Sequence, residues 1–171
     1  MESHEKVVVL GLSMGGLLAL LMAEELPVDG VIALAATIHI RNRMAPLARV
    51  LAPFMPRQKE NLEAGCKDPQ DIGYGIMPHK KIPDLLNLAR MARNNLNRIH
   101  CPMLVAQSKL DESVAADGPK IILDGTVNCF DKEMLWLEKS PHVCTYGEEF
   151  PILSAKIGEF MARIDAMDPM E

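Results

Sequence analysis

The chain has 171 residues, of which 49% are hydrophobic and 24% charged, values typical of one globular domain with its own core. Its formal net charge of −5 argues against a general nucleic-acid binder, because binding to phosphates requires clustered lysine and arginine. The apolar stretch at residues 7–23 is interrupted by glycines and a serine, so it predicts a buried strand and helix and no membrane span.

The cysteines are scattered, without a CxxC pair or a spacing typical of metal ligands; they are Cys66, Cys101, Cys129 and Cys144. We therefore expect buried free thiols, a cytoplasmic protein and no metal site. The acidic N-terminal residues do not resemble the basic start of a signal peptide, which agrees with that location.

Short apolar runs predict the strands of a parallel sheet, because such strands are covered on both faces. They lie at residues 7–10, 31–35, 103–106 and 133–137. Helical patterns follow at residues 17–23, around 120–124 and at 153–164. Alternation of strands with helices predicts an α/β fold, with a parallel sheet and flanking helices.

One segment, residues 37–98, breaks this alternation with several prolines and no convincing strand. Short helices fit best, at about 45–51 and 84–96, the second with an apolar face of Leu85, Leu88, Met91 and Ala92. A helical insertion between two sheet strands is typical of a cap over an active site, and a helical subdomain without a gating role is the alternative. This predicts core residues 1–36, a helical cap insertion at 37–98 and further core residues 99–171.

The segment Gly11-Leu12-Ser13-Met14-Gly15 has the Gly-x-Ser-x-Gly pattern of a nucleophile elbow between a strand and a helix. Such a turn exposes the serine hydroxyl at the end of the strand, and glycines beside it avoid steric clashes. The backbone N–H of Met14 lies at the start of the helix, where it can stabilise negative charge as part of an oxyanion hole.

A nucleophilic serine requires a base, usually a histidine that a carboxylate orients. Asp111 follows the strand at 103–106, and His142 follows the strand at 133–137. Both are therefore expected at the same edge of the sheet as Ser13. They follow Ser13 in the chain order Ser, Asp, His that is typical of enzymes with a nucleophile elbow.

Other side chains are weaker candidates for these two roles. His4 precedes the first strand, and His39, His79 and His100 lie in or beside the insertion. Glu112 and Asp117 are the alternatives to Asp111, although Asp117 is placed to cap the helix that follows it.

Together these stretches resemble the α/β-hydrolase superfamily and, more narrowly, the small bacterial carboxylesterases related to monoacylglycerol lipases. The matching residues are 6–16, then 101–107 leading to Asp111, then 137–143. The resemblance implies a partial α/β-hydrolase fold in which Ser13 is the nucleophile, Asp111 the acid and His142 the base, with no cofactor.

The chain also departs from that family pattern. Pro141 stands before His142, where the family usually has glycine, and the family's His-Gly loop, which gives the second oxyanion donor, has no counterpart here. Met14 N–H is therefore the one oxyanion donor that the sequence indicates. The strand at 7–10 is expected at a sheet edge, and an apolar edge predicts self-association.

The sequence thus predicts a serine hydrolase that cleaves small carboxylic esters with short to medium acyl chains through an acyl-enzyme. A thioesterase or acyltransferase with the same triad is an alternative, as is a catalytically impaired hydrolase fragment that acts as an interaction module. Apolar residues of the cap can line the acyl pocket or pack the cap's own core; they are Leu51, Phe54, Met55 and Met77.

Overall fold

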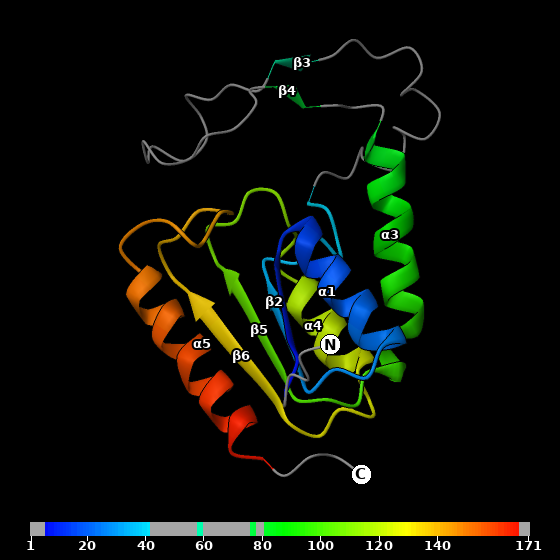
Figure 1. Ribbon diagram of the computed structural model, residues 1–171. Coiled ribbons are helices and arrows are strands. Elements are labelled where there is room, and N and C mark those ends of the chain that lie inside the picture. Colours follow the sequence, from blue (N-terminus) through cyan, green and yellow to red (C-terminus); the bar gives the residue numbers. More distant parts are fainter. Residues whose placement is uncertain (1–5, 42–57, 60–75, 78–80, 168–171) are drawn as a thin grey trace.

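The computed structural model describes residues 6–41, 58–59, 76–77 and 81–167. At its centre, four parallel strands form a sheet in the order β1-β2-β5-β6 (Figure 1). The strands are β1 (Val8–Leu12), β2 (Gly30–Leu34), β5 (Met103–Ser108) and β6 (Lys132–Leu137). Each overlaps one of the runs expected from the sequence, so the four predicted strands are confirmed.

Helices follow the strands along the chain, which confirms the predicted α/β alternation. They are α1 (Met14–Glu25), α3 (Ile82–Asn95) with the short 3₁₀ helix η4 (Leu96–Arg98) after it, α4 (Gly118–Gly125) and α5 (Phe150–Asp165). None of the helices in the described part of the chain is long and apolar enough to cross a lipid bilayer.

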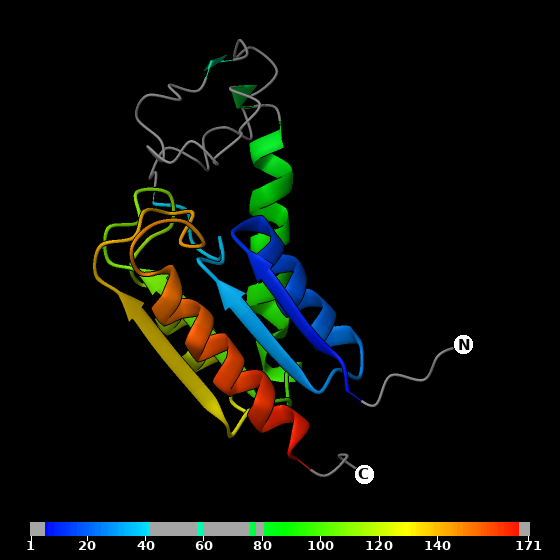
Figure 2. The same ribbon diagram turned by 60° about the vertical axis from the view of Figure 1, so that its left-hand side comes forward.

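The helices cover the sheet in two layers, with α1, α3 and α4 on one face and α5 on the other (Figures 1 and 2). Because side chains along a strand alternate between the two faces, Val31 and Ala33 pack into the first layer. Ile32 and Leu34 pack into the second layer. Every residue of β2 is buried, which explains why its sequence is a continuous apolar run.

The strand β1 lies at one edge of the described sheet, as expected, and β6 lies at the other. On β1, Val9 and Gly11 are buried, whereas Leu10 is 50% exposed. Self-association through this edge stays a prediction.

The helix α3 confirms the helix expected near residues 84–96, but its buried face differs in part from the predicted one. Ala89 and Ala92 are buried against α1, with Leu85 and Leu88 partly buried beside them, while Met91 is exposed. Small alanine side chains let the two helices approach closely. The buried face of α3 is therefore centred nearer Ala89, and farther from Met91, than the predicted apolar face.

Two short strands in the insertion contradict the expectation that it contains none. They are β3 (Gln58–Lys59) and β4 (Ile76–Met77), which pair in antiparallel fashion. Two residues are too few to show the alternation of a strand, so the sequence pattern could not reveal them. The helix expected at 45–51 lies outside the described residues, and the division into core and cap stays a prediction.

The cysteines in the described part of the chain are free and buried, as predicted. They are Cys101, Cys129 and Cys144, whereas Cys66 lies outside the described residues. Burial raises the pKa of the Cys101 and Cys144 thiols to about 11, so both stay protonated and unreactive at neutral pH.

Glu24, near the end of α1, carries a buried carboxyl group. It is 8% exposed, and neither of its carboxylate oxygens has a hydrogen-bond partner within the part of the chain that the structure describes. Burial, and then the charge of Glu25, raise the pKa of Glu24 to about 7, against a smaller opposing effect of Arg98.

A raised carboxyl pKa makes stability depend on pH, because the native state binds more protons than the unfolded chain. The stabilisation is complete below the ordinary pKa of 4.5 and is lost as the pH rises through about 7. We expect Glu24→Gln to raise the free energy of unfolding at pH 8 by about 1–3 kcal/mol, and to leave it unchanged near pH 4.5. Urea unfolding across this pH range measures the difference.

The matched control is Glu112→Gln, the same change at an exposed side chain. It is expected to shift stability little at either pH. An unfolding free energy that depends on pH equally in the chain and in Glu24→Gln would contradict the assignment to Glu24.

Candidate active site

Ser13 occupies the sharp turn between β1 and α1. Its backbone has φ 57 and ψ −118, a conformation that residues with a side chain rarely adopt and that typically costs about 1–3 kcal/mol. The end of β2 holds this turn in place, because Ser13 N–H donates to the carbonyl of Leu34 at 2.8 Å. In return, Thr37 N–H donates to the carbonyl of Ser13 at 3.2 Å.

Two of the three glycines near Ser13 are required by close packing. A Cβ on Gly11 would lie 2.0 Å from the carbonyl oxygen of Gly15, and one on Gly16 would lie 2.8 Å from the Cβ of Ala36. A Cβ on Gly15 would meet nothing within 4 Å. The expectation that both motif glycines prevent a clash is therefore correct for Gly11 and wrong for Gly15, because the space beside Gly15 is open.

This difference predicts opposite results for two neighbouring alanine substitutions. Gly16→Ala is expected to lower the free energy of unfolding by about 1–3 kcal/mol, because α1 and the segment after β2 that carries Ala36 must move apart. Gly15→Ala, within α1, is expected to leave stability unchanged or raise it by up to about 1 kcal/mol. Urea unfolding of both variants tests this, and equal destabilisation would contradict it.

His142 lies between the other two predicted site residues. Its Nε2 is 2.8 Å from Ser13 Oγ, and its Nδ1 is 2.8 Å from Asp111 Oδ2. Asp111 follows β5, His142 follows β6 and Ser13 follows β1, so the carboxyl ends of three parallel strands bring these groups to one edge of the sheet. The imidazole is 17% exposed and the Asp111 side chain 1%, so only the His142 end of this pair meets solvent.

The Asp111 carboxylate accepts hydrogen bonds at both of its oxygens. Oδ1 accepts the N–H groups of Ser113 and Val114, and Oδ2 accepts Gln107 Nε2–H and the Nδ1–H of His142. Burial by itself raises the pKa of Asp111, but the bonds from His142, Val114 and Ser113 outweigh it and hold this pKa below its ordinary value. The carboxylate therefore stays ionised at neutral pH and fixes the Nδ1–H tautomer of the imidazole.

The competing candidates in the described chain are not part of this arrangement. His39 and Asp117 pair with each other at 2.7 Å, and Asp117 makes no side-chain cap to α4. His100 and Glu112 are exposed. His4 and His79 lie outside the described residues.

Three contacts at the site were not expected from the sequence. Thr37 Oγ1 lies 3.1 Å from Ser13 Oγ, Gln107 donates to Asp111 as described, and Arg41 Nη1 donates to the carbonyl of Asp111 at 2.9 Å. Thr37 lies two positions after the predicted strand at 31–35, and Gln107 directly follows the one at 103–106. That position after a strand is the one sequence feature that could have identified them as site residues.

Met14, predicted to give an oxyanion donor, is the first residue of α1 and follows Ser13 directly. Its N–H therefore lies at the positive end of the helix dipole. Of the predicted acyl-pocket residues, Leu51, Phe54 and Met55 lie outside the described residues. Met77 ends β4, and its side chain is likewise outside what the structure describes.

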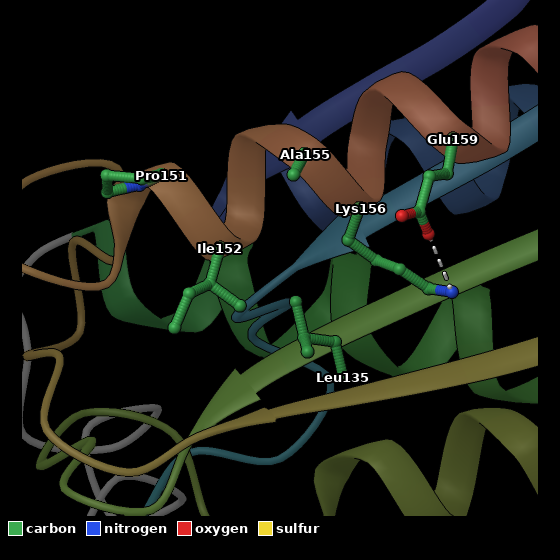
Figure 3. Close-up of a pocket in the computed structure, with 6 residues that line it drawn as sticks. All are labelled: Leu135, Pro151, Ile152, Ala155, Lys156 and Glu159. Carbon is green, nitrogen blue, oxygen red and sulfur yellow. Dashed lines mark ion pairs between the residues drawn. The ribbon is translucent and has the colours of Figure 1, made fainter.

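A surface hollow of about 460 Å³ lies between α5 and β6 (Figure 3), and none of Ser13, His142 and Asp111 lines it. Leu135 lines it from the sheet, and the remaining lining residues belong to α5: Pro151, Ile152, Ala155, Lys156 and Glu159. An ion pair between Lys156 and Glu159 lies along its wall. In the described part of the chain, no group of three or more His, Cys, Asp or Glu side chains is arranged to hold a metal ion.

A parallel sheet between helices, with an elbow serine, a histidine and an aspartate after successive strand ends, is the architecture of an α/β-hydrolase. A family model described as serine aminopeptidase, S33 matches residues 1–148, and the chain belongs to that family. The resemblance seen in the sequence is therefore confirmed.

Curated relatives include esterases and lipases. The chain is 28% identical over 170 residues to a carboxylesterase of Bacillus subtilis (strain 168), covering 96% of this chain and 67% of the relative. It is 29% identical over 162 residues to a thermostable monoacylglycerol lipase of Bacillus sp. (strain H-257), covering 93% of this chain and 64% of the relative. The chain thus spans about two thirds of the length of these relatives.

Solved structures show the same fold. A metagenome-derived lipolytic enzyme matches with a TM-score of 0.81 and 27% identity, over 93% of this chain and 66% of that one. The monoacylglycerol lipase of Paleococcus ferrophilus matches with a TM-score of 0.76 and 19% identity, over 94% of this chain and 69% of that one. At 19% identity the second match supports the fold alone.

Proposed function

We propose that this chain hydrolyses carboxylic esters with short to medium acyl chains through an acyl-enzyme on Ser13. The observation that supports this most is the continuous hydrogen-bonded series from Ser13 Oγ through both nitrogens of His142 to Asp111, with both links at 2.8 Å. The similarity to a carboxylesterase and a monoacylglycerol lipase agrees with ester cleavage.

In the proposed reaction, Ser13 Oγ attacks the ester carbonyl carbon while His142 Nε2 takes the hydroxyl proton. His142 then gives this proton to the leaving alkoxide, and the alcohol departs from the acyl-enzyme. Water, activated by the same imidazole, attacks the acyl-enzyme, and the carboxylic acid and free Ser13 result. Asp111 holds the imidazole in the tautomer that can accept the proton and stabilises the imidazolium that forms.

The negative charge that develops on the carbonyl oxygen requires a donor, and the N–H of Met14 is our candidate. Each such donor typically contributes about 10²–10³ in rate. Leu51, Phe54, Met55 and Met77 remain the candidates for contact with the acyl chain, because apolar side chains, and the adaptable methionine above all, suit acyl groups of varied shape.

The direct test is hydrolysis of p-nitrophenyl butyrate by the chain and by Ser13→Ala. We expect Ser13→Ala to lose activity to within background, because no other group replaces the nucleophile. A fluorophosphonate probe is expected to label Ser13 in the unaltered chain and nothing in the variant. Ser154→Ala, a change at an exposed serine on α5, is the control and is expected to keep full activity.

A folded chain that neither cleaves the ester nor reacts with the probe would contradict the proposal and favour an impaired hydrolase that acts as an interaction module. An amino-acid p-nitroanilide in the same assay distinguishes ester from amide cleavage. Faster cleavage of the anilide than of the ester would assign the site to a peptidase reaction.

Asp111→Asn tests the role of the carboxylate separately. An amide NH₂ beside His142 Nδ1 makes that nitrogen an acceptor, so Nε2 carries the proton and cannot take one from Ser13. We expect kcat to fall by about 10³–10⁴ with little change in KM. The measurement is steady-state hydrolysis of p-nitrophenyl butyrate, and an activity within about tenfold of the unaltered chain would contradict the assignment.

A further inference from the structure

The loop that carries His142 has to cross much of the sheet. β6 lies three strand positions from β1, which corresponds to about 14 Å at the usual spacing between strands. Residues 138–149 connect β6 to α5 without a helix or strand, and His142 lies within them. The bonds of the imidazole to Ser13 and Asp111 orient the ring, but the backbone that carries the ring needs support of its own.

That support comes from one buried carboxylate at the start of α5. Glu149 Oε1 accepts the N–H of Glu138 at 2.8 Å. Its Oε2 accepts the N–H of Lys139 at 2.8 Å, and both the N–H and the hydroxyl of Ser140, at 2.7 Å and 2.6 Å. Glu149 is 8% exposed, so these bonds are shielded from water.

Ser140, two residues before His142, is fixed on a second side as well. The hydroxyl of Ser108, the last residue of β5, donates to the carbonyl of Ser140. The N–H, hydroxyl and carbonyl of Ser140 are therefore all bonded, and the residue itself is 3% exposed. The path from this anchor to the His142 backbone is only one residue, Pro141, whose ring restricts the backbone further.

The Glu149 carboxylate does not cap the helix that it precedes. Glu149 is the N-cap residue of α5, yet its side chain makes no cap hydrogen bond to that helix. The carboxylate reaches back to the His142 loop instead. Burial alone raises the pKa of Glu149, but the bonds from Ser140, Glu138 and Lys139 outweigh it and lower this pKa to about 2.

We propose that Glu149 is a positioning residue, which holds the His142 loop so that the imidazole meets Ser13 and Asp111 at the same time. This inference rests on the proposed function for its effect on rate. Misplacing a reacting group by about 1 Å can cost about 10²-fold in rate, so a loop anchor of this kind affects proton transfer directly.

Glu149→Gln is the test, because the amide has the same shape but presents an NH₂ group to N–H donors and cannot accept all four bonds. Glu148→Gln is the matched control. Glu148 is adjacent, exposed, and contacts the same loop through an ion pair with Lys139 at 3.2 Å. Ser140→Ala is the intermediate variant, since it removes one of the four bonds and leaves the backbone bonds in place.

We expect Glu149→Gln to lower kcat for p-nitrophenyl butyrate by about 10–100-fold, with KM changed by no more than about twofold. Fluorophosphonate labelling of Ser13 is expected to slow by the same factor, Ser140→Ala to show a smaller loss, and Glu148→Gln none. Because Glu149 stays ionised down to about pH 2, the loss is expected to be equal at every pH from 5 to 9. The assays are run well below the thermal midpoint of each variant, with near-UV circular dichroism to show a native fold.

A second readout does not depend on turnover. The ring ¹⁵N–¹H signals of His142 in nuclear magnetic resonance are expected to shift or broaden in Glu149→Gln and to stay unchanged in Glu148→Gln. Unchanged kcat and unchanged His142 signals, with only a lower thermal midpoint, would overturn the proposal and make Glu149 a stabiliser of the fold. If the unaltered chain has no ester activity and no labelling, the proposed function fails, while the His142 signals still decide the role of Glu149.

Discussion

The strained backbone of Ser13 is the constraint on which the rest of the site depends. With φ 57, the residue can neither continue β1 nor begin α1 in a regular conformation, so its side chain is left at the end of the sheet. The turn closes only because Gly11 leaves room for the Gly15 carbonyl and Gly16 leaves room for Ala36. The packing of a few small residues therefore determines where the serine hydroxyl and the Met14 N–H lie, before any partner side chain is added.

The segment after β2 connects the serine to the loop of the aspartate. Thr37 contacts Ser13 through both its N–H and its hydroxyl, and four residues later Arg41 donates to the Asp111 carbonyl. Between them, the carbonyl of His39 accepts the N–H of Ala115. A shift of this segment would therefore move Ser13 and Asp111 together.

The sequence was informative where local pattern and chemistry coincide. Fully buried strands such as β2 appear as unbroken apolar runs, and the order Ser13, Asp111, His142 after three strands led to groups that do meet. It was uninformative where a residue matters through a distant partner. Glu149 lies nine positions after Ser140, across irregular chain, and the contact of Gln107 with Asp111 depends on how the loop after β5 turns. Likewise, Ala89 is buried and Met91 is exposed because of how α3 packs against α1, and the periodicity of the sequence does not specify that packing.

Three buried carboxyl groups show that the number of hydrogen-bond donors around a carboxyl group determines whether its pKa is raised or lowered in this fold. Burial by itself raises the pKa of each of the three. Asp111 and Glu149 each accept four hydrogen bonds, which outweigh this effect, so the net result is a lowered pKa for both. Glu24 accepts none from the described residues, and its pKa is raised to about 7. The two carboxylates with donors both lie beside the loops at the carboxyl ends of β5 and β6, where turning backbone leaves N–H groups unpaired. The same irregular loops that bring His142 to Ser13 thus supply the donors that keep the supporting charges ionised, whereas α1, whose N–H groups are used within the helix, offers Glu24 nothing comparable.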